Sequence, residues 1–216
     1  MFKRLFGRGE AAGAPPLPTI RNVTIGRTLM VDTLAWRRFG ADIRFPLDRD
    51  TLVITAQGLV ELNEGGWVHR FYTDDHVMFQ AVSNDREGQD VTDLTLFAPW
   101  ESTYPGGRED RAAWRRRMSG QSFTAPGLPE YRRLWFGDEA AVQEPVTFWE
   151  DLHDDRDGVA DRRIFQTCML FARDLGDESG SEGRELLLAI EQEPEGDAVS
   201  HEIMIGVPLE AGELRA

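Results

Sequence analysis

Short runs of bulky apolar residues recur along this chain of 216 residues, and polar stretches rich in Gly, Asn and Asp separate them. In the first half the runs start about ten positions apart, which is typical of antiparallel strands joined by hairpins. Strands connected through helices would need longer intervening segments. Residues 56–58 are expected to turn the first two strands into a hairpin. The expected strands are residues 52–54, 59–62, 67–72, 77–82, 94–97, 146–150, 163–172, 185–191 and 200–207.

Two stretches depart from this rhythm. Residues 28–39 indicate a strand and then a short helix, with Gly40 as its stop. Residues 99–145 are punctuated by proline, and their best helix candidate is 109–118, ended by Ser119 and Gly120. The predicted class is therefore α+β: predominantly antiparallel β meanders in two sequence lobes, with one or two short helices in the middle.

The pattern divides the chain into four parts. Residues 1–19 form a flexible basic and Pro-rich tail, and 20–98 form an N-terminal β lobe. Residues 99–145 are an irregular linker with an Arg-rich helix, and 146–210 form an acidic C-terminal β lobe. Whether the two lobes form one domain, or share one sheet, is left open by the pattern.

Charge narrows the class of partner. The chain carries 24 Lys and Arg against 38 Asp and Glu, a net charge of −14. This balance disfavours a general nucleic-acid binder, which needs clustered cations. Residues 1–136 hold 18 cations and 17 anions, whereas residues 137–216 hold 6 and 21. The acidity therefore belongs to the last third, and the two segments are expected to attract each other or to face different partners.

One cysteine, Cys168, is present, so an intrachain disulfide is excluded. A single Cys fits a reducing compartment, and no apolar run approaches the ~20 residues of a membrane span. We therefore expect a cytoplasmic protein. Because Cys168 lies within an apolar strand pattern, we expect a buried structural thiol instead of a nucleophile, which would need access and nearby positive charge.

Two groups of residues carry metal-binding side chains. His69, Asp74, Asp75 and His76 could hold a metal or line a pocket, and the competing interpretation is a hairpin whose turn contains the two Asp residues. The acidic stretch 150–161 imitates part of a calcium loop. If Gly158 is its sixth position, however, His153 and Ile164 stand where Asp and Glu are required. This favours a solvated acidic turn.

Two groups of residues are candidates for interaction. Arg108, Arg111 and Arg115 share one face of the expected helix. That face is expected to be solvated, to bind an acidic partner or the chain's own acidic third, or, least consistent with the net charge, to bind nucleic acid. Phe2, Leu5 and Phe6 alternate with cations at the start of the chain and suit a peripheral contact with an anionic membrane, the competing interpretation being a frayed tail.

Catalytic signatures are missing from the sequence. It contains neither a Gly-x-Ser-x-Gly elbow nor a P-loop, and its glycines do not form a dinucleotide-binding fingerprint. We therefore expect no cofactor and assign no catalytic residue, and the sequence leans away from an enzyme.

Aromatic and turn positions in residues 61–75, 79–80 and 97–100 resemble the YjfK-like family of uncharacterised bacterial proteins, as do the basic-apolar start and the Pro-rich linker. The resemblance implies a cytosolic protein, often encoded near a PspA-like membrane-stress coiled-coil protein and small membrane proteins. It implies no catalytic residue. The favoured hypothesis is thus a non-enzymatic adaptor with a protein partner, acting at the inner-membrane surface. The alternative is a small-molecule or metal-binding protein, possibly an enzyme, with a pocket around His69, Asp74, Asp75 and His76.

Overall fold

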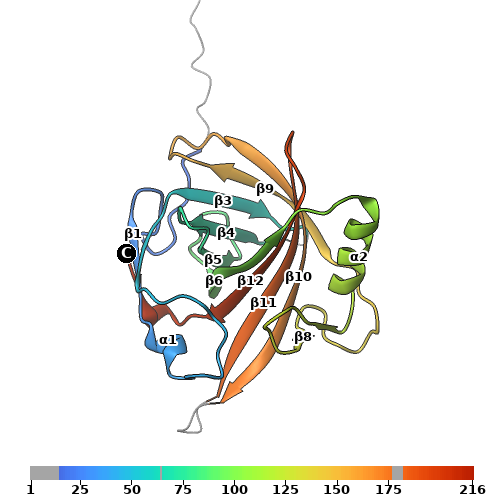
Figure 1. Cartoon of the computed structure of the whole chain (residues 1–216). Helices are drawn as coiled ribbons and strands as arrows, with labels where there is room; N and C mark the ends of the chain where they lie inside the picture. Colours follow the sequence, from blue (N-terminus) through green and yellow to red (C-terminus); the bar gives the residue numbers. More distant parts are fainter. Residues whose placement is uncertain (1–14, 64, 177–181) are drawn as a thin grey trace, which may run out of the picture.

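A computed structural model describes residues 15–63, 65–176 and 182–216, and its centre is a closed β-barrel (Figure 1). Eight antiparallel strands pair in the order β11-β12-β6-β5-β4-β3-β9-β10, and β10 pairs with β11 to close the ring. The barrel strands are β3 (Ala56–Glu61), β4 (Trp67–Tyr72), β5 (Met78–Ser83), β6 (Val91–Thr103), β9 (Val146–His153), β10 (Arg162–Gly176), β11 (Glu182–Pro194) and β12 (Ser200–Pro208).

β3 to β6 pair in succession, and so do β9 to β12. They are not separate sheets, however. β6 pairs with β12 and β3 pairs with β9, so the four strands β3–β6 and the four strands β9–β12 join at both edges into one ring. The coarse expectation of a mostly antiparallel β protein with few helices is confirmed, and the barrel is what the pattern did not predict.

A second, three-stranded sheet has the order β13-β1-β2 and covers one side of the barrel (Figure 1). It consists of β1 (Thr28–Val31), β2 (Thr51–Val53) and β13 (Leu214–Arg215). The predicted hairpin between residues 52–54 and 59–62 is therefore wrong, since β2 pairs with β1 and β3 pairs with β4. The expected strand and short helix in 28–39 are confirmed by β1 and α1 (Leu34–Arg37), and Gly40 has a φ of +55°.

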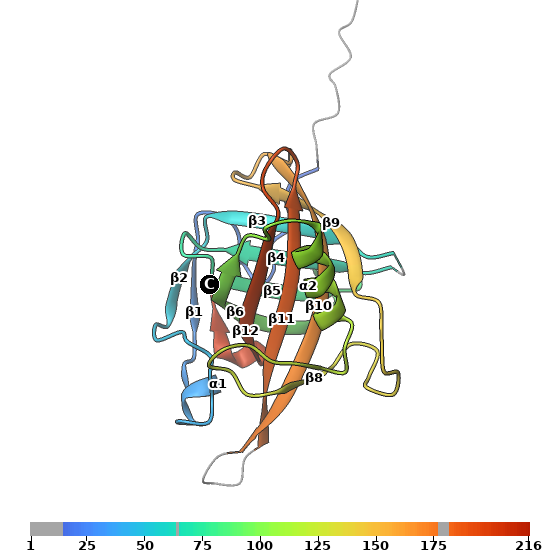
Figure 2. The same cartoon turned by 45° about the vertical axis from the view of Figure 1, so that its right-hand side comes forward.

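The opposite side of the barrel carries α2 (Arg108–Met118), which lies across the outer face of the long strands (Figure 2). The short strands β7 (Ser122–Phe123) and β8 (Tyr131–Arg133) follow it, and β8 pairs with the second half of β10. A 3-10 turn, η1 (Ala211–Glu213), leads into β13. No described helix is long and apolar enough to cross a membrane.

Successive side chains of each strand point to opposite faces of the sheet, and they therefore belong to two different cores. One core contains residues of the eight barrel strands, among them Val60, Phe97, Cys168 and Leu188, and forms the barrel interior. The other joins the outward-facing side chains to residues of the small sheet, α1, α2, β7 and β8. Outer segments thus bury much of the outer face of the barrel, although Trp149 of β9 is 42% exposed, and polar groups on either face become enclosed.

Candidate functional site

The polar chemistry of the described chain gathers around three glutamates, Glu150, Glu185 and Glu191, whose exposed fraction is 0%. A buried carboxylate is costly unless charged or hydrogen-bonding partners surround it. Each of the three has such partners. Glu150 lies on β9, and Glu185 and Glu191 lie toward the two ends of β11.

Glu150 lies inside the barrel and pairs with Arg70 of β4, which is 2% exposed. The Arg70 Nη1 atom lies 3.0 Å from Glu150 Oε2 and donates to Gln166 Oε1 at 2.7 Å, and Nε donates to Gln80 Oε1 at 3.0 Å. The Tyr72 hydroxyl donates to Glu150 Oε1 at 2.7 Å. The interior ion pair is therefore hydrogen-bonded on both sides.

Side chains fill the space around this pair. A Cβ atom added to Gly58 would lie 1.7 Å from Glu150 Oε1, and one added to Gly206 would lie 2.5 Å from the Phe97 ring. At both positions a side chain of the neighbouring, paired strand packs directly on the glycine backbone, so only glycine fits. Buried apolar side chains from all eight barrel strands surround the pair, and the interior is filled in the manner of small barrels.

Two interior groups, Cys168 and Tyr72, are held in their protonated forms. Burial raises the pKa of Cys168 to about 12, and Cys168 is fully buried, which confirms the expected structural thiol. Burial, together with the charge of Glu150, raises the pKa of Tyr72 well above its ordinary value. Neither group is an activated nucleophile or base at neutral pH.

Glu191, at the outer face of β11, binds α2 to the barrel. Arg111 Nη2 and Arg115 Nη2 lie 2.8 and 2.5 Å from its Oε1, and His201 Nε2 lies 3.0 Å from its Oε2. The His201 ring stacks on Trp114 of α2, with centroids 4.6 Å apart and planes 5° apart. Burial acts to raise the pKa of Glu191, but the hydrogen bonds from these three partners outweigh it and lower the pKa.

Glu185, at the other end of β11, attaches the segment before β2 and the strand β8. Its Oε1 accepts from the Phe45 backbone N–H at 2.8 Å and from the Arg44 N–H. Its Oε2 accepts from Tyr131 and from Arg173 Nε, both at 2.7 Å. Like Glu191, this carboxylate connects covering segments to the barrel, which is a structural role.

Two of the predicted interaction arginines are therefore used inside the molecule. Arg111 and Arg115 bind Glu191 and Glu193, which matches the expected alternative of contact with the chain's own acidic third. Arg108 begins the helix and is exposed. The predicted candidates Phe2, Leu5 and Phe6 lie outside the described residues.

The predicted set His69, Asp74, Asp75 and His76 is divided between two environments. His69 lies in the middle of β4 and is 0% exposed, whereas the other three form the exposed turn after β4. Across 15–63, 65–176 and 182–216, no group of three or more His, Cys, Asp or Glu side chains is placed to hold a metal ion. Asp74 and Asp75 lie in a turn, as the competing hairpin interpretation expects, and His76 adopts a φ of +62° in the same turn.

His69 is unusual because both ring nitrogens are buried without a hydrogen-bond partner. The loop after β5 covers it, and a Cβ on Gly88 of that loop would lie 3.7 Å from His69 Nε2 and 1.8 Å from Ile20. Burial lowers the pKa of His69, while the nearby Asp85 acts to raise it. The ring is therefore neutral at pH 7.

The acidic stretch 150–161 uses its carboxylates to shape its own turn. Asp155 accepts from the Asp157 N–H at 2.9 Å, Asp157 accepts from the Val159 N–H at 2.7 Å, and Asp161 accepts from the Asp154 N–H at 2.7 Å. The first two are the local side chain to backbone contacts of Asx turns, and the third joins the two ends of the loop. The arrangement fits the expected acidic turn better than a calcium loop.

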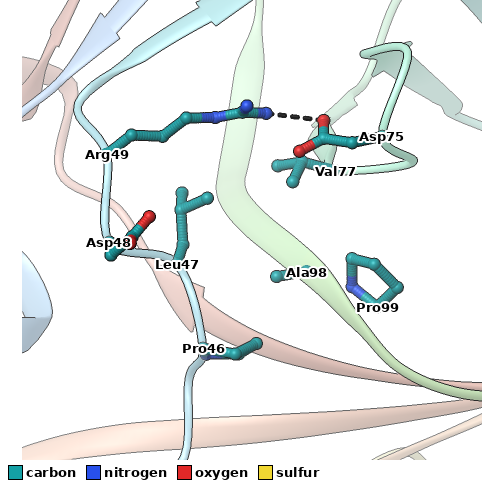
Figure 3. A pocket seen from close by; sticks show the side chains of 8 residues that line it. All are labelled: Pro46, Leu47, Asp48, Arg49, Asp75, Val77, Ala98 and Pro99. Atoms are coloured by element: carbon teal, nitrogen blue, oxygen red, sulfur yellow. Dashed lines mark hydrogen bonds and ion pairs between the residues drawn. The ribbon is translucent and has the colours of Figure 1, made fainter.

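One hollow in the surface contains a predicted residue, Asp75 (Figure 3). Arg49 Nη2 lies 2.5 Å from Asp75 Oδ1 across it, above an apolar floor that includes Leu47, Val77 and Pro99. Its volume is about 210 Å³, below the range of roughly 300–1,000 Å³ that small-molecule sites occupy. His69 does not line it, so the predicted pocket does not form as a unit.

The sequence contains a signal for the buried charges. Glu185 and Glu191 flank the apolar run 186–190, and Arg70 shares one face of a predicted strand with Val68 and Tyr72. A charged residue in the register of a buried face indicates a paired, enclosed charge. The pattern does not identify the group that pairs with each buried charge, because that group lies on a strand or helix distant in the sequence.

Fold and site together define a closed, filled β-barrel whose buried charges hold its covering segments in place. The chain belongs to the family DUF2491, described as "Protein of unknown function", which matches residues 1–215. It is 26% identical to "Uncharacterized protein YjfK" of Escherichia coli (strain K12) over 154 residues, which cover 69% of this chain and 68% of that protein. The resemblance to the YjfK-like family is thus confirmed. No solved structure matches.

Proposed function

We propose that this protein is a non-enzymatic adaptor that brings a protein partner to the inner-membrane surface. The observation that carries the proposal is the filled barrel interior, in which the Arg70–Glu150 pair and its hydrogen bonds occupy the place where ligand-binding barrels hold their ligand. The other two buried carboxylates bind covering segments. Function is then carried by the outside of the molecule and by its N-terminal segment.

The N-terminal segment suits a membrane contact by composition. Residues 2–8 combine Phe2, Leu5 and Phe6 with Lys3, Arg4 and Arg8. Apolar side chains insert at the lipid interface while cations bind anionic headgroups. The described chain that follows is fastened to the barrel, because Gln57 Nε2 donates to the Pro18 carbonyl at 2.9 Å. A membrane contact at residues 2–8 would therefore be transmitted to the folded body through a short connection.

Co-sedimentation with vesicles tests this proposal. The full chain should sediment with phosphatidylglycerol-containing vesicles and not with phosphatidylcholine vesicles. Replacing Phe2, Leu5 and Phe6 together by Ser should lower the partition coefficient about ten-fold or more, because the apolar part of the contact is removed.

The matched control replaces three exposed apolar residues of the described surface by Ser. Leu34, Tyr104 and Val159 are 66%, 73% and 58% exposed, and their substitution should leave sedimentation unchanged. Equal binding of the N-terminal variant and the parent, or absence of binding by the parent, would remove the membrane part of the proposal.

A further inference from the structure

Near its start, the described chain lies against the outer face of the barrel as a strap, residues 17–24. Three side chains of the strap are buried there, namely Leu17, Ile20 and Val23. The Pro18 carbonyl accepts from Gln57 Nε2 of β3 at 2.9 Å, and just after the strap the Gly26 N–H donates to the Ile54 carbonyl at 2.8 Å. Apolar packing and hydrogen bonds near its two ends therefore fasten the strap to the barrel.

The middle of the strap is a tight turn with unfavourable backbone geometry. Ile20 and Val23 exchange both backbone hydrogen bonds, and the two residues between them have positive φ values, +50° at Arg21 and +68° at Asn22. Asn tolerates this conformation, whereas a long side chain such as that of Arg adopts it at a cost. Arg21 Nη1 donates to the Ala211 carbonyl at 3.1 Å. Strain of this kind persists where surrounding contacts impose it, so the turn relaxes if the strap leaves the barrel.

Buried polar atoms without partners are concentrated under the strap. Six buried side-chain nitrogen and oxygen atoms of the described residues lack a hydrogen-bond partner, and four of them belong to Thr24, Gln57 and His69. Each of these atoms has lost its contact with water and has gained no partner in exchange, which disfavours the closed arrangement. Opening the strap would let water reach them, so the same region combines backbone strain with unsatisfied polar groups.

His69 lies where the strap meets the loop of residues 84–90. A Cβ atom on Gly88 of this loop would lie 1.8 Å from Ile20 of the strap and 3.7 Å from His69 Nε2. The neighbouring strands present apolar side chains opposite the ring, Leu59 of β3 and Ala81 of β5. A proton on this ring would therefore be a buried charge without a hydrogen-bond acceptor.

Charged groups near the ring come from several elements. The loop contributes Asp85, Arg86 and Glu87. The other elements contribute Arg21 of the strap, Glu61 of β3 and His153 of β9, which stands opposite Gln57. Burial lowers the pKa of His69 more than Asp85 raises it. Hydrogen bonds, first of all from the Gln89 N–H, lower the pKa of Asp85 itself, so Asp85 stays ionised at pH 5.5 and is not the group that titrates.

We infer that His69 is a pH-dependent latch, which releases the strap from the barrel in acid while the eight strands stay paired. A protonated ring is stable in contact with water, so the proton stabilises the state in which the strap and the loop have moved apart. The closed strap is fully favoured above the ordinary His pKa of 6.5 and loses stability as the pH falls toward the lower pKa of the closed state.

Release of the strap changes the attachment of the N-terminal segment. Residues 17–25, once free, lengthen the connection between residues 2–8 and the barrel by up to about 30 Å. The latch goes beyond the proposed function, because it concerns how this segment is attached. It does not require that residues 2–8 bind a membrane.

Hydrogen–deuterium exchange of the full chain at pH 7.5 and pH 5.5 tests the latch, with rates converted to protection factors to remove the chemical effect of pH. The protection factors of residues 17–26 and 84–90 should fall about three-fold or more at pH 5.5. Those of the paired stretches of β10 and β11 should stay unchanged. In His69→Leu, which cannot take up the proton, the strap should be equally protected at both pH values.

The matched control is His153→Asn, which removes the other histidine beside the strap and should keep the pH response of the parent. The latch is overturned if the strap of the parent is equally protected at both pH values, or if the loss at pH 5.5 extends equally to β10 and β11. These two results need no variant to fold. A pH response in His69→Leu equal to that of the parent would also overturn it. Vesicle sedimentation of the parent at pH 7.5, where the strap is closed, tests the membrane proposal separately.

Discussion

At the scale of single residues, the molecule satisfies almost every buried charge and leaves one histidine unsatisfied. Glu150, Glu185 and Glu191 each have several donors, which offset the cost of burying a carboxylate. His69 is as deeply buried but has no partner at either ring nitrogen. We therefore expect protonation of His69 in acid to lower the stability of the fold.

The stability of the protein should therefore depend on the protonation of His69. Its folded pKa lies below the ordinary value of 6.5, so between these two values the unfolded chain binds a proton that the folded chain does not. The free energy of unfolding is complete above pH 6.5 and falls as the pH decreases toward the folded pKa. His69→Leu should flatten this dependence when urea unfolding is compared at pH 7.5 and pH 5.5.

His76→Asn is the matched control for this measurement. His76 is exposed and its backbone has a φ of +62°, which Asn tolerates. This variant should keep the pH dependence of the parent. An unchanged slope in His69→Leu, or an equal loss in both variants, would contradict the assignment.

At the scale of elements, the local pattern predicts the helix α2 but not the groups that its cationic face binds. The expected helix 109–118 corresponds to α2, because its residues have the right spacing and Ser119 and Gly120 end it. The sequence leaves the partner of its cationic face open, and the structure places Arg111 and Arg115 against Glu191 and Glu193. Nothing local in the sequence selects these carboxylates, since they follow about eighty residues later.

Glu191 should contribute more to stability than its neighbour Glu193. Glu191→Gln removes a fully buried carboxylate shared by Arg111, Arg115 and His201, and the free energy of unfolding should fall by about 2 kcal/mol. Glu193 is 29% exposed, and Glu193→Gln should cost less than about 1 kcal/mol. Chemical denaturation of the two variants measures both values.

The pH dependence gives a second readout of the same contact. Because the folded pKa of Glu191 is lowered, its stabilisation is complete above the unfolded value and is lost as the pH falls through the folded pKa. Glu191→Gln should therefore differ most from the parent at neutral pH and least in acid. Equal costs for the Glu191 and Glu193 variants at neutral pH would show that α2 is held by packing alone.

At the scale of the whole molecule, the sequence pattern predicted the strands but not the ring. Strand existence follows from local alternation, and the successive pairings within β3–β6 and β9–β12 follow from short loops. The closing pairs β3–β9 and β6–β12 join segments on opposite sides of residues 99–145. The charge division has the same explanation, because the acidic last third supplies the carboxylates that pair with Arg70 and α2.

Because the eight strands form one closed ring, we expect the protein to unfold in a single transition. Neither predicted lobe can close its barrel alone, because each leaves two edge strands without partners. Urea unfolding followed by far-UV circular dichroism and by tryptophan fluorescence should give coincident curves. Trp36 and Trp114 report on opposite covers of the barrel. Two separated transitions, or a stably folded fragment of residues 146–216, would contradict a single cooperative unit.

The closing strand pairs also set the order of events during synthesis. β6 cannot pair with β12, and β3 cannot pair with β9, until about a hundred further residues have been synthesised. The mean sequence separation of contacts is therefore high, and folding is expected to be slow. Until those later strands leave the ribosome, the first meander has two free edges and an uncovered apolar face. The nascent chain, and not the finished barrel, is thus the species most exposed to aggregation and most dependent on chaperones.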